Sequence, residues 1–280
     1  MEGCAIPVKK EKPLRAKTPF GWFGGKTYAT TWLLPIIAKT PHVCFVDVFG
    51  GSGTVLWNKS PSPVEVYNDL HSEVVNFFRV LREQPDKLIE QLNLTPYSRE
   101  EYKACLNCAE EPIDRARAFF VVARQVSRGL ATTASEGRWC YVRSESRKGK
   151  SLVVSRWLGA IEYLEELVER IRYVTIENLD YKDILSRYDT PDTLFYLDPP
   201  YLPEVRPGGT AYKHEFNAAN HEEMLDLITK LKGKVLLSGY ENKLYSDKLV
   251  AWEKFEAEPK CINSANFQKA RVCQEVLWIK

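Results

Sequence analysis

The chain has 280 residues, a length that allows one large domain or a core domain carrying an insert. Hydrophobic residues make up 44% of it and charged residues 27%, as is typical of a folded globular protein. Its formal net charge of +2 excludes a uniformly basic surface, so a surface for nucleic acid has to come from local clusters of Lys and Arg. No apolar run approaches the ~20 residues of a membrane span, and the N-terminus lacks the apolar stretch of a signal peptide. We therefore expect a cytoplasmic protein.

The seven cysteines stand at irregular spacing, which argues against a disulfide framework. Cys105 and Cys108 are closely spaced, but no second pair of Cys or His stands near them to complete four zinc ligands. We expect no metal centre. Residues 1–17 are rich in Lys, Glu and Pro without apolar periodicity, and they predict a flexible tail.

A glycine-rich stretch over residues 19–27 precedes a predicted helix over residues 28–37. Its Gly-Lys-Thr ending invites a phosphate-loop interpretation. That motif requires a glycine five residues before Gly25, where Phe20 stands, and a hydrophobic strand before it, which is missing. The sequence therefore does not predict an ATP site here.

An apolar run over residues 43–48 leads into a Phe-Gly-Gly-Ser-Gly turn over residues 49–53, and a helix begins near Val55. Strand, glycine turn and helix in this order form the opening unit of a doubly wound sheet, in which the N–H groups of the turn face a ligand. The turn lacks the third glycine of a dinucleotide-binding fingerprint. The sequence predicts a ligand site at this turn, but not a site of the dinucleotide type.

Acidic residues end the next two predicted strands. Asp69 follows an alternating stretch from residue 64, and in nucleotide-type sites an acid at this place accepts hydrogen bonds from ribose hydroxyls. Asp180 and Tyr181 end a third strand that starts at residue 173. Either acid can also cap the helix that follows it, and the sequence leaves both interpretations open.

The short apolar strand over residues 194–197 ends in Asp198-Pro199-Pro200-Tyr201. The carboxyl end of such a strand is where an open α/β sheet places its ligand. Prolines have no N–H group but keep their carbonyls, so the corner is rich in hydrogen-bond acceptors and lies beside an aromatic ring. It suits a planar group with an amine. Adenine fits, with Asp198 and the Pro199 carbonyl accepting the amine hydrogens and Tyr201 stacking on the ring.

The alternation of strand and helix lapses over residues 84–171, which predicts an inserted helical subdomain. Between Arg115 and Arg156 ten Lys or Arg stand against two acids, with aromatic and short polar residues among them. Basic and polar side chains suit phosphate contacts, and aromatic rings stack beside an unstacked base. We interpret the stretch as a DNA-contacting arm rather than a solvated loop. The candidate contacts are Arg124, Arg128, Arg138, Trp139, Arg143, Arg147 and Lys148.

The rest of the chain continues the sheet. The pattern predicts a mobile loop over residues 202–217, a helix over 221–232 capped by Asn220, and strands over 234–240, 252–258 and 275–279.

Together these motifs resemble the Dam-like family of adenine-specific DNA methyltransferases. The similarity is carried by the segment Phe23 to Lys26, by the acids at the strand ends and above all by the Asp-Pro-Pro-Tyr corner at Asp198. The resemblance implies a Rossmann-like, doubly wound mixed α/β sheet of the methyltransferase fold, with a basic helical target-recognition subdomain inserted. It implies a catalytic domain made of residues 18–83 and 172–280, with residues 84–171 as the insert.

The resemblance further implies S-adenosylmethionine as methyl donor and, as acceptor, the 6-amino group of a flipped adenine in double-stranded DNA. It assigns catalysis to Asp198, Pro199 and Tyr201. The residues that it implies for the methyl donor are Phe23, Gly25, Lys26, Asp47, Phe49, Gly51, Gly53, Asp69, Asp180, Tyr181 and Asp198.

Alternatives remain open at this point. The amine of cytosine presents the same two hydrogens, so methylation of cytosine at N4 is one alternative, and a DNA-binding relative that has lost catalysis is another. We expect a monomer or weak dimer. The sequence leaves open a partner restriction endonuclease.

Overall fold

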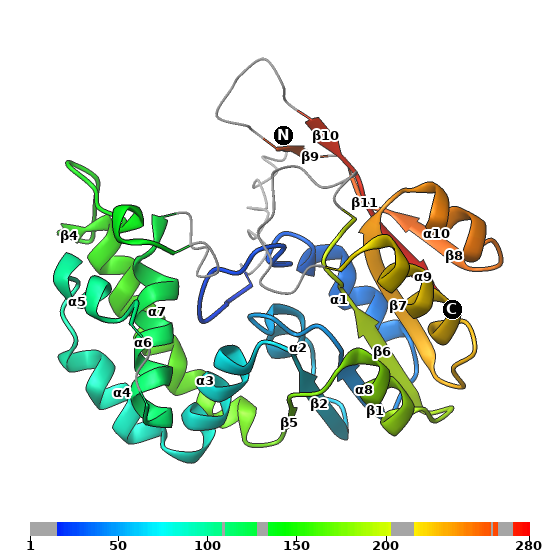
Figure 1. Cartoon of the computed structure of the whole chain (residues 1–280), viewed down its shortest axis with the longest axis horizontal. Coiled ribbons are helices and arrows are strands. Elements are labelled where there is room, and N and C mark those ends of the chain that lie inside the picture. Colours follow the sequence, from blue (N-terminus) through cyan, green and yellow to red (C-terminus); the bar gives the residue numbers. More distant parts are fainter. Residues whose placement is uncertain (1–15, 108–109, 128–133, 203–215, 259, 263–270) are drawn as a thin grey trace, which may run out of the picture.

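The computed structural model describes residues 16–107, 110–127, 134–202, 216–258, 260–262 and 271–280. In this part of the chain a seven-stranded sheet lies between layers of helices (Figure 1). The strands are β1 (Cys44–Asp47), β2 (Val64–Asn68), β5 (Thr175–Glu177), β6 (Thr193–Leu197), β7 (Lys234–Tyr240), β8 (Glu253–Glu256) and β11 (Glu275–Ile279).

The strand order is β5-β2-β1-β6-β7-β11-β8. The strands from β5 to β7 in this order run parallel, whereas β11 runs antiparallel to both of its neighbours. The predicted doubly wound mixed sheet is thereby confirmed. The chain reverses its direction of winding between β1 and β6, and the carboxyl ends of such a pair of strands open a crevice for ligands. In the register of this pair Asp47 lies opposite Tyr196, two residues before Asp198.

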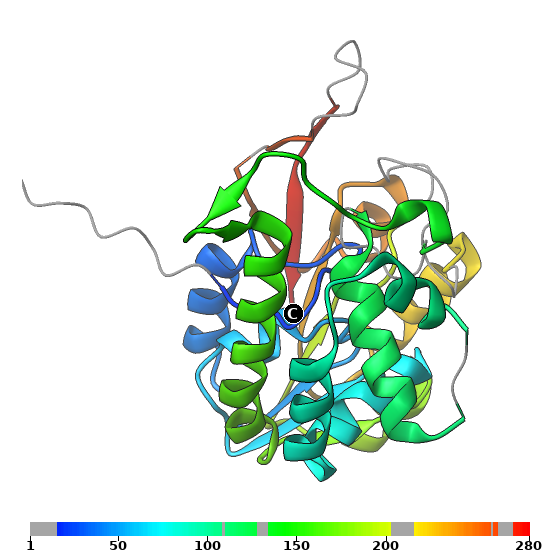
Figure 2. The same ribbon diagram turned by 90° about the vertical axis from the view of Figure 1, so that its left-hand side faces the viewer.

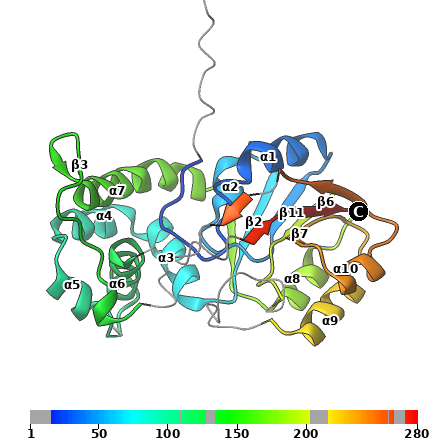
Figure 3. The same cartoon turned by 90° about the horizontal axis from the view of Figure 1, so that it is seen from above.

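Each face of the sheet has its own helices. Helices α1 (Thr30–Lys39), α2 (Thr54–Asn58) and α3 (Ser72–Glu83) cover one face, and α8 (Tyr181–Tyr188), α9 (Ala218–Ile228) and α10 (Lys243–Lys248) cover the other. Figure 3 shows α1 and α2 on one side of the strands and α8, α9 and α10 on the other. Successive strand residues point to opposite faces, so Phe45 packs in the first layer and Val46 in the second. Burial on both faces explains why the central strands β1 and β6 are continuous apolar runs.

Four helices between residues 85 and 171 lie beside the sheet (Figures 1 and 2). They are α4 (Pro85–Leu94), α5 (Arg99–Ala104), α6 (Pro112–Gln125) and α7 (Leu152–Ile171). Phe77 of α3 stacks on Phe120 of α6 with ring centroids 5.4 Å apart, and Phe120 in turn contacts Trp157 of α7 at 5.6 Å. The core of the helical region is therefore continuous with the layer that covers the sheet.

A buried ion-pair cluster also joins α7 to the sheet. Glu65 of β2 accepts from Lys59 and from Arg170 of α7, each at 2.5 Å, and the Glu65 side chain is only 1% exposed. Removing one partner of such a cluster leaves a buried charge without compensation. The cluster therefore fixes the position of α7 against the start of β2.

Several short elements were not predicted. Strands β3 (Ser146–Arg147) and β4 (Lys150–Ser151) form a hairpin whose turn residues, Lys148 and Gly149, have φ values of 54° and 72°. A turn with two left-handed residues joins tightly paired antiparallel strands. The other elements that were not predicted are the 3₁₀ turn η3 (Glu136–Arg138), helix α10, and the antiparallel pair β9 (Lys260–Ile262) and β10 (Arg271–Cys273). Each of these elements has two to six residues and contains no apolar run, so no local pattern marks it.

Helix α9 begins earlier than the sequence predicted. The capping residue is Asn217, not Asn220, and its side chain accepts from the Asn220 N–H while Asn220 bonds back to the Asn217 N–H. This reciprocal pair is a capping box built from two asparagines. Asn220 therefore belongs to the first turn of the helix, and the predicted cap was wrong by three residues.

Candidate active site

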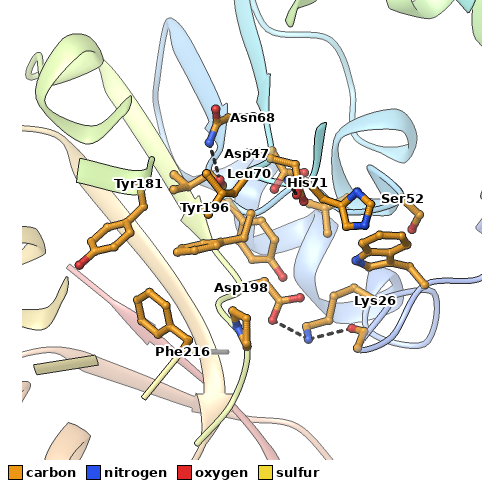
Figure 4. Close-up of a pocket in the computed structure, with 18 of the residues that line it drawn as sticks. Lys26, Asp47, Ser52, Asn68, Leu70, His71, Tyr181, Tyr196, Asp198 and Phe216 are labelled. Carbon is orange, nitrogen blue, oxygen red and sulfur yellow. Dashed lines mark hydrogen bonds and ion pairs between the residues drawn. The ribbon is translucent and has the colours of Figure 1, made fainter. Parts of the chain in front are cut away.

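A cavity of about 520 Å³ opens at the carboxyl ends of β1, β2 and β6 (Figure 4). Its volume lies in the range of small-molecule sites. Its lining comes from the segment at 22–26, from 47–55 after β1, from 68–71 after β2, from 179–182 after β5, and from 196–200 around the end of β6. The motifs that the sequence placed at separate strand ends thus meet around one cavity.

Asp198 lines this cavity and is held by a buried lysine. The ammonium of Lys26 lies 2.7 Å from Oδ1 of Asp198 and 3.1 Å from Oε1 of Glu275, and it donates to the hydroxyl of Tyr201 at 2.6 Å. The side chains of Lys26 and Glu275 are 3% and 4% exposed, and that of Asp198 is 16% exposed. One cation is therefore shared between two carboxylates at the edge of the cavity.

The protonation states of Asp198 and Lys26 are determined by burial and by the charges of neighbouring residues. Burial raises the pKa of Asp198 to about 6; the neighbouring Lys26 lowers it in part, and Glu275 raises it again. Burial by itself lowers the pKa of Lys26, but Asp198 and Glu275 outweigh this effect and hold it well above the usual range. At neutral pH Asp198 is a carboxylate and Lys26 an ammonium ion.

Tyr201 takes a different place from the one that the sequence suggested. Tyr201 is 9% exposed and is not among the residues that line the cavity, and its ring meets that of Tyr240 in a T-shaped contact with centroids 4.8 Å apart. Its hydroxyl accepts from Lys26 and donates to Glu275. In this structure Tyr201 is a hydrogen-bonded member of the cluster and does not present the open stacking face that we expected.

A buried histidine holds the proline corner from the other side. His221 donates from Nε2 to the carbonyl of Pro200 at 3.0 Å and accepts at Nδ1 from the hydroxyl of Tyr245 at 2.8 Å. Burial lowers the pKa of His221 to about 4, so the ring is neutral. The carbonyl can only accept, which places the ring proton on Nε2. Pro200 lines the cavity and Pro199 is buried beside it. Nothing in the sequence marks His221 for this role.

Asp47 brings a second carboxylate into the cavity. It is 2% exposed, and its Oδ1 is buried without a hydrogen-bond partner in the described part of the chain. Burial, followed by repulsion from Asp198 and Asp69, raises the pKa of Asp47 well above its usual range. A buried acceptor without a partner is costly, so this oxygen is suited to a donor or cation supplied by a ligand.

Asp69 fixes the glycine turn to the end of β2. Its Oδ2 accepts from the N–H of Gly51 and its Oδ1 from the N–H of His71, both at 2.7 Å. His71, not Asp69, is the N-cap residue of α3.

The neighbouring Asn68 was not predicted as a site residue, but it connects the ends of three strands. It donates to the carbonyls of Val48 and Leu179 and accepts from the Leu179 N–H. A polar residue within a buried strand is the signal that marks it.

Three aromatic rings form one end of the cavity. Phe49 and Tyr181 stack with centroids 6.0 Å apart and an interplanar angle of 28°, and Phe216 meets both edge-on. Figure 4 shows Tyr181 and Phe216 at one end, Lys26 at the other and Asp198 between them. Asp180 caps α8 by accepting from the Lys182 N–H at 2.9 Å and also lines the cavity, so the cap is confirmed and a contact with a ligand stays a prediction. Phe216 was not predicted.

The glycines of the two turns differ in their position. Gly25 and Phe23 line the cavity, as do Gly50 and Ser52, but Gly51 and Gly53 do not. Gly53 has a φ of 66°, and a β-carbon on it would collide with the indole of Trp57. The requirement for glycine at position 53 thus comes from its conformation and from ring packing beneath the turn.

The predicted DNA-contacting residues divide into two groups. Arg124 donates to the carbonyl of Arg156 in α7 at 2.9 Å, and burial lowers its pKa to about 10. Trp139 donates to Gln125 at 3.0 Å and packs between the rings of Tyr97 and Tyr141. Arg124 is thus half-buried and bonded to α7, and Trp139 anchors its segment to α6; that either residue contacts DNA stays a prediction.

Other basic candidates are open to solvent. Arg143, Arg147 and Lys148 are exposed, the last two in the β3–β4 hairpin, while Arg138 is half-buried and donates to the Ser127 carbonyl at 3.3 Å. Arg128 and most of the predicted loop at 202–217 lie outside the described residues. The exposed positive charge of the arm is therefore concentrated at the hairpin.

The sheet order, with β11 antiparallel between β7 and β8, and the site at its switch point define a methyltransferase fold. The sequence matches the family of D12 class N6 adenine-specific DNA methyltransferases over residues 22–258, and the chain belongs to this family. It is 27% identical over 244 residues to the type II methyltransferase M1.LlaDCHI of Lactococcus lactis subsp. cremoris, covering 80% of this chain and 81% of that relative. The chain is therefore a DNA methyltransferase of the adenine-specific class.

Two features are absent from the residues that the structure describes. None of their helices has the length and apolar character to traverse a lipid bilayer. No three of their His, Cys, Asp or Glu side chains gather as ligands of a metal ion would.

Proposed function

We propose that this enzyme transfers a methyl group from S-adenosylmethionine to the 6-amino group of an adenine that has been flipped out of double-stranded DNA. The observation that carries the proposal is the Asp198 carboxylate at the cavity edge, oriented by Lys26 and followed by the proline carbonyls. The family of the chain favours adenine over the alternative of cytosine N4.

The cavity suits the proposed donor. S-adenosylmethionine supplies a methyl group on a positively charged sulfur, and its amino group adds a second positive charge. Asp47, Asp69 and Asp198 line the cavity, and the unpartnered Oδ1 of Asp47 is suited to a cationic group. The stacked rings of Phe49 and Tyr181 offer an aromatic end that suits a planar base. We propose that Asp69 accepts from the ribose hydroxyls.

We propose that Asp198 and the carbonyl of Pro199 accept the two hydrogens of the adenine amine. The lone pair of this nitrogen is delocalised into the ring, which makes it a weak nucleophile. Two acceptors favour a more tetrahedral nitrogen whose lone pair points at the methyl carbon. The acceptors also stabilise the positive charge that grows on nitrogen during the transfer, so the rate gain comes from positioning and electrostatics. Asp198 or water takes the proton that the methylated amine then loses.

Base flipping is required because the amine is paired inside the duplex. It costs a few kcal/mol, which contacts in the cavity have to offset. We propose that three exposed residues, Arg143 just before the hairpin and Arg147 and Lys148 within it, bind backbone phosphates and so hold the duplex over the cavity.

The test of the catalytic assignment is the variant Asp198→Ala in a radiolabelled transfer assay. We expect the rate of transfer to fall by at least about 1000-fold, since an essential acceptor in the transition state is lost. Calorimetric titration should show the donor still bound. Asp192→Ala is the matched control, because Asp192 is an exposed acid at the opposite end of the same strand. Wild-type turnover in the Asp198 variant would show that the assignment is wrong.

The acceptor base is tested on the product. Duplex substrates methylated by the enzyme are digested to nucleosides and separated. We expect N6-methyladenine. If the product is N4-methylcytosine instead, cytosine and not adenine is the substrate.

Since the relative is a type II methyltransferase, we also propose that this enzyme acts as a monomer or weak dimer beside a restriction endonuclease of the same specificity. Sedimentation and challenge of methylated DNA with such a nuclease test these two points.

A further inference from the structure

Glu275 opens β11 and is 4% exposed. It lies outside residues 22–258, over which the family match extends, and it does not line the cavity. Burial of an acid at the start of an apolar strand is costly unless the acid is paired. Glu275 is paired with Lys26 and Tyr201, two residues that also contact Asp198.

Both oxygens of Glu275 are engaged. Oε1 receives the hydroxyl of Tyr201 and lies 3.1 Å from the ammonium of Lys26, while Oε2 receives the hydroxyl of Tyr28 at 2.6 Å. On the neighbouring strand Glu275 is registered with Tyr240, whose ring packs on Tyr201. Glu275, which does not line the cavity, thus holds Lys26 and Tyr201, and both of these contact Asp198.

These contacts determine which donors reach Asp198. The hydroxyl of Tyr201 has a single hydrogen, and its contact with Glu275 is shorter than its 3.1 Å contact with Asp198. While Glu275 takes this hydrogen, Lys26 is the donor to Asp198. Lys26 and Tyr201 both contact Asp198 at its Oδ1. Oδ2 is thus left for a ligand in the described part of the chain.

We infer that Glu275 is a positioning residue for methyl transfer: by retaining the hydrogen of Tyr201 and sharing Lys26, it keeps Asp198 oriented and available as an acceptor for the substrate amine. This inference rests on the proposed role of Asp198. Glu275 does not touch the substrate in this arrangement and acts through Lys26 and Tyr201.

The charge of Glu275 acts in the same direction as its hydrogen bonds. Its repulsion is one of the causes that raise the pKa of Asp198, after burial and against the opposing effect of Lys26. Without this charge, Lys26 and the hydrogen of Tyr201 would both turn to Asp198, lower its pKa and weaken it as an acceptor. The titratable groups that face Asp198 from the surrounding elements are Lys26, Tyr28, Asp47, Tyr196, Tyr201, Tyr245 and Glu275.

The decisive experiment is the pH profile of Glu275→Gln, measured as kcat/KM and kcat for methyl transfer to a duplex. In the wild-type enzyme kcat/KM should fall as the pH drops through about 6, because Asp198 must be ionised to accept the amine. In the variant we expect this acid limb to move to lower pH by on the order of one unit. We expect kcat at neutral pH to fall about tenfold while KM for the donor is unchanged.

Two variants that retain the charge serve as controls. Tyr28→Phe removes the hydrogen bond to Oε2 but leaves the charge of Glu275, so the acid limb should stay in place. Glu275→Asp retains the charge on a shorter side chain, and we expect a lower kcat with the acid limb of the wild-type enzyme. If Glu275→Gln does not fold, the Glu275→Asp result decides: an unchanged kcat there overturns the inference.

Three outcomes separate the inference from the function on which it rests. A Glu275→Gln enzyme with both the kcat and the acid limb of the wild type would overturn it. So would a fall in kcat with an unmoved limb, matched in Tyr28→Phe, because this would be an effect of packing alone. If instead Asp198→Ala retains turnover, the proposed role of Asp198 fails, and the inference fails with it.

Discussion

The cluster around Asp198 and the β3–β4 hairpin both depend on charged side chains, but their charges are in opposite surroundings. Lys26 is 3% exposed and touches two carboxylates and a hydroxyl. Arg147 and Lys148 are exposed at the end of a two-stranded hairpin. In the cluster the geometry of each charge is fixed before a ligand arrives. On the hairpin the charges are free to adapt to a backbone of any sequence.

This difference decides what each region can do. Interactions among buried charges are little screened by salt and are strong at short range, so they suit chemistry that needs a fixed orientation. Exposed charges are screened within about 10 Å at 0.1 M salt, and their contribution to DNA binding comes from the release of counterions. We therefore expect changes at the cluster to affect the rate of transfer, and changes at the hairpin to affect affinity and its dependence on salt.

The largest difference is expected between two glycines in left-handed conformations. Gly53 has a φ of 66° and lies against Trp57, whereas Gly149 has a φ of 72° and open space where a β-carbon would lie. We expect Gly53→Ala to destabilise the protein by at least about 3 kcal/mol, from backbone strain and collision together, and to abolish donor binding. Gly149→Ala carries the strain alone, at about 1 kcal/mol. Urea unfolding and calorimetric titration of the donor measure the two effects.

Equal destabilisation by the two alanines would mean that conformation, not packing, determines the glycine turn. Retained donor affinity in Gly53→Ala would separate the turn from the donor site.

A smaller effect is expected from removing the exposed positive charges in the hairpin and just before it. In the triple variant Arg143→Ala, Arg147→Ala and Lys148→Ala we expect DNA affinity to fall by about tenfold or more at low salt. The slope of log affinity against log salt should become shallower by about three, one for each phosphate contact. Turnover at saturating DNA should be unchanged, because none of these residues lines the cavity. Fluorescence anisotropy over a series of salt concentrations provides the measurement.

The smallest effect is expected at Arg124, which serves as the matched control for the hairpin. Its guanidinium donates to the Arg156 carbonyl within the helical region. Arg124→Met should leave the salt slope as it is in the wild-type enzyme. A slope reduced by about one would place Arg124 on the DNA after all, and an unchanged slope in the triple variant would remove the hairpin from the DNA surface.

Much of the fold could be predicted because buried parallel strands are continuous apolar runs, and because each ends in residues that break the pattern. The glycines after β1 and the prolines after β6 placed the ligand site at the switch point of the sheet. The helical insert was visible as a lapse in that alternation. Asp69, Asp180 and Asp198 could be selected because acids at the carboxyl ends of parallel strands lie along one edge of the sheet. Asp47 was selected only from the resemblance to the family.

The sequence by itself determined the main strands of the sheet, their succession along the chain and the acids at their ends. These follow from local periodicity and from the geometry of parallel sheets. Only the tertiary structure decided which groups meet across long separations in the chain. It brought Glu275 to Lys26, turned Tyr201 away from the cavity and directed Arg124 to α7. Such contacts depend on the packing of elements that are distant in sequence, and no local pattern records them.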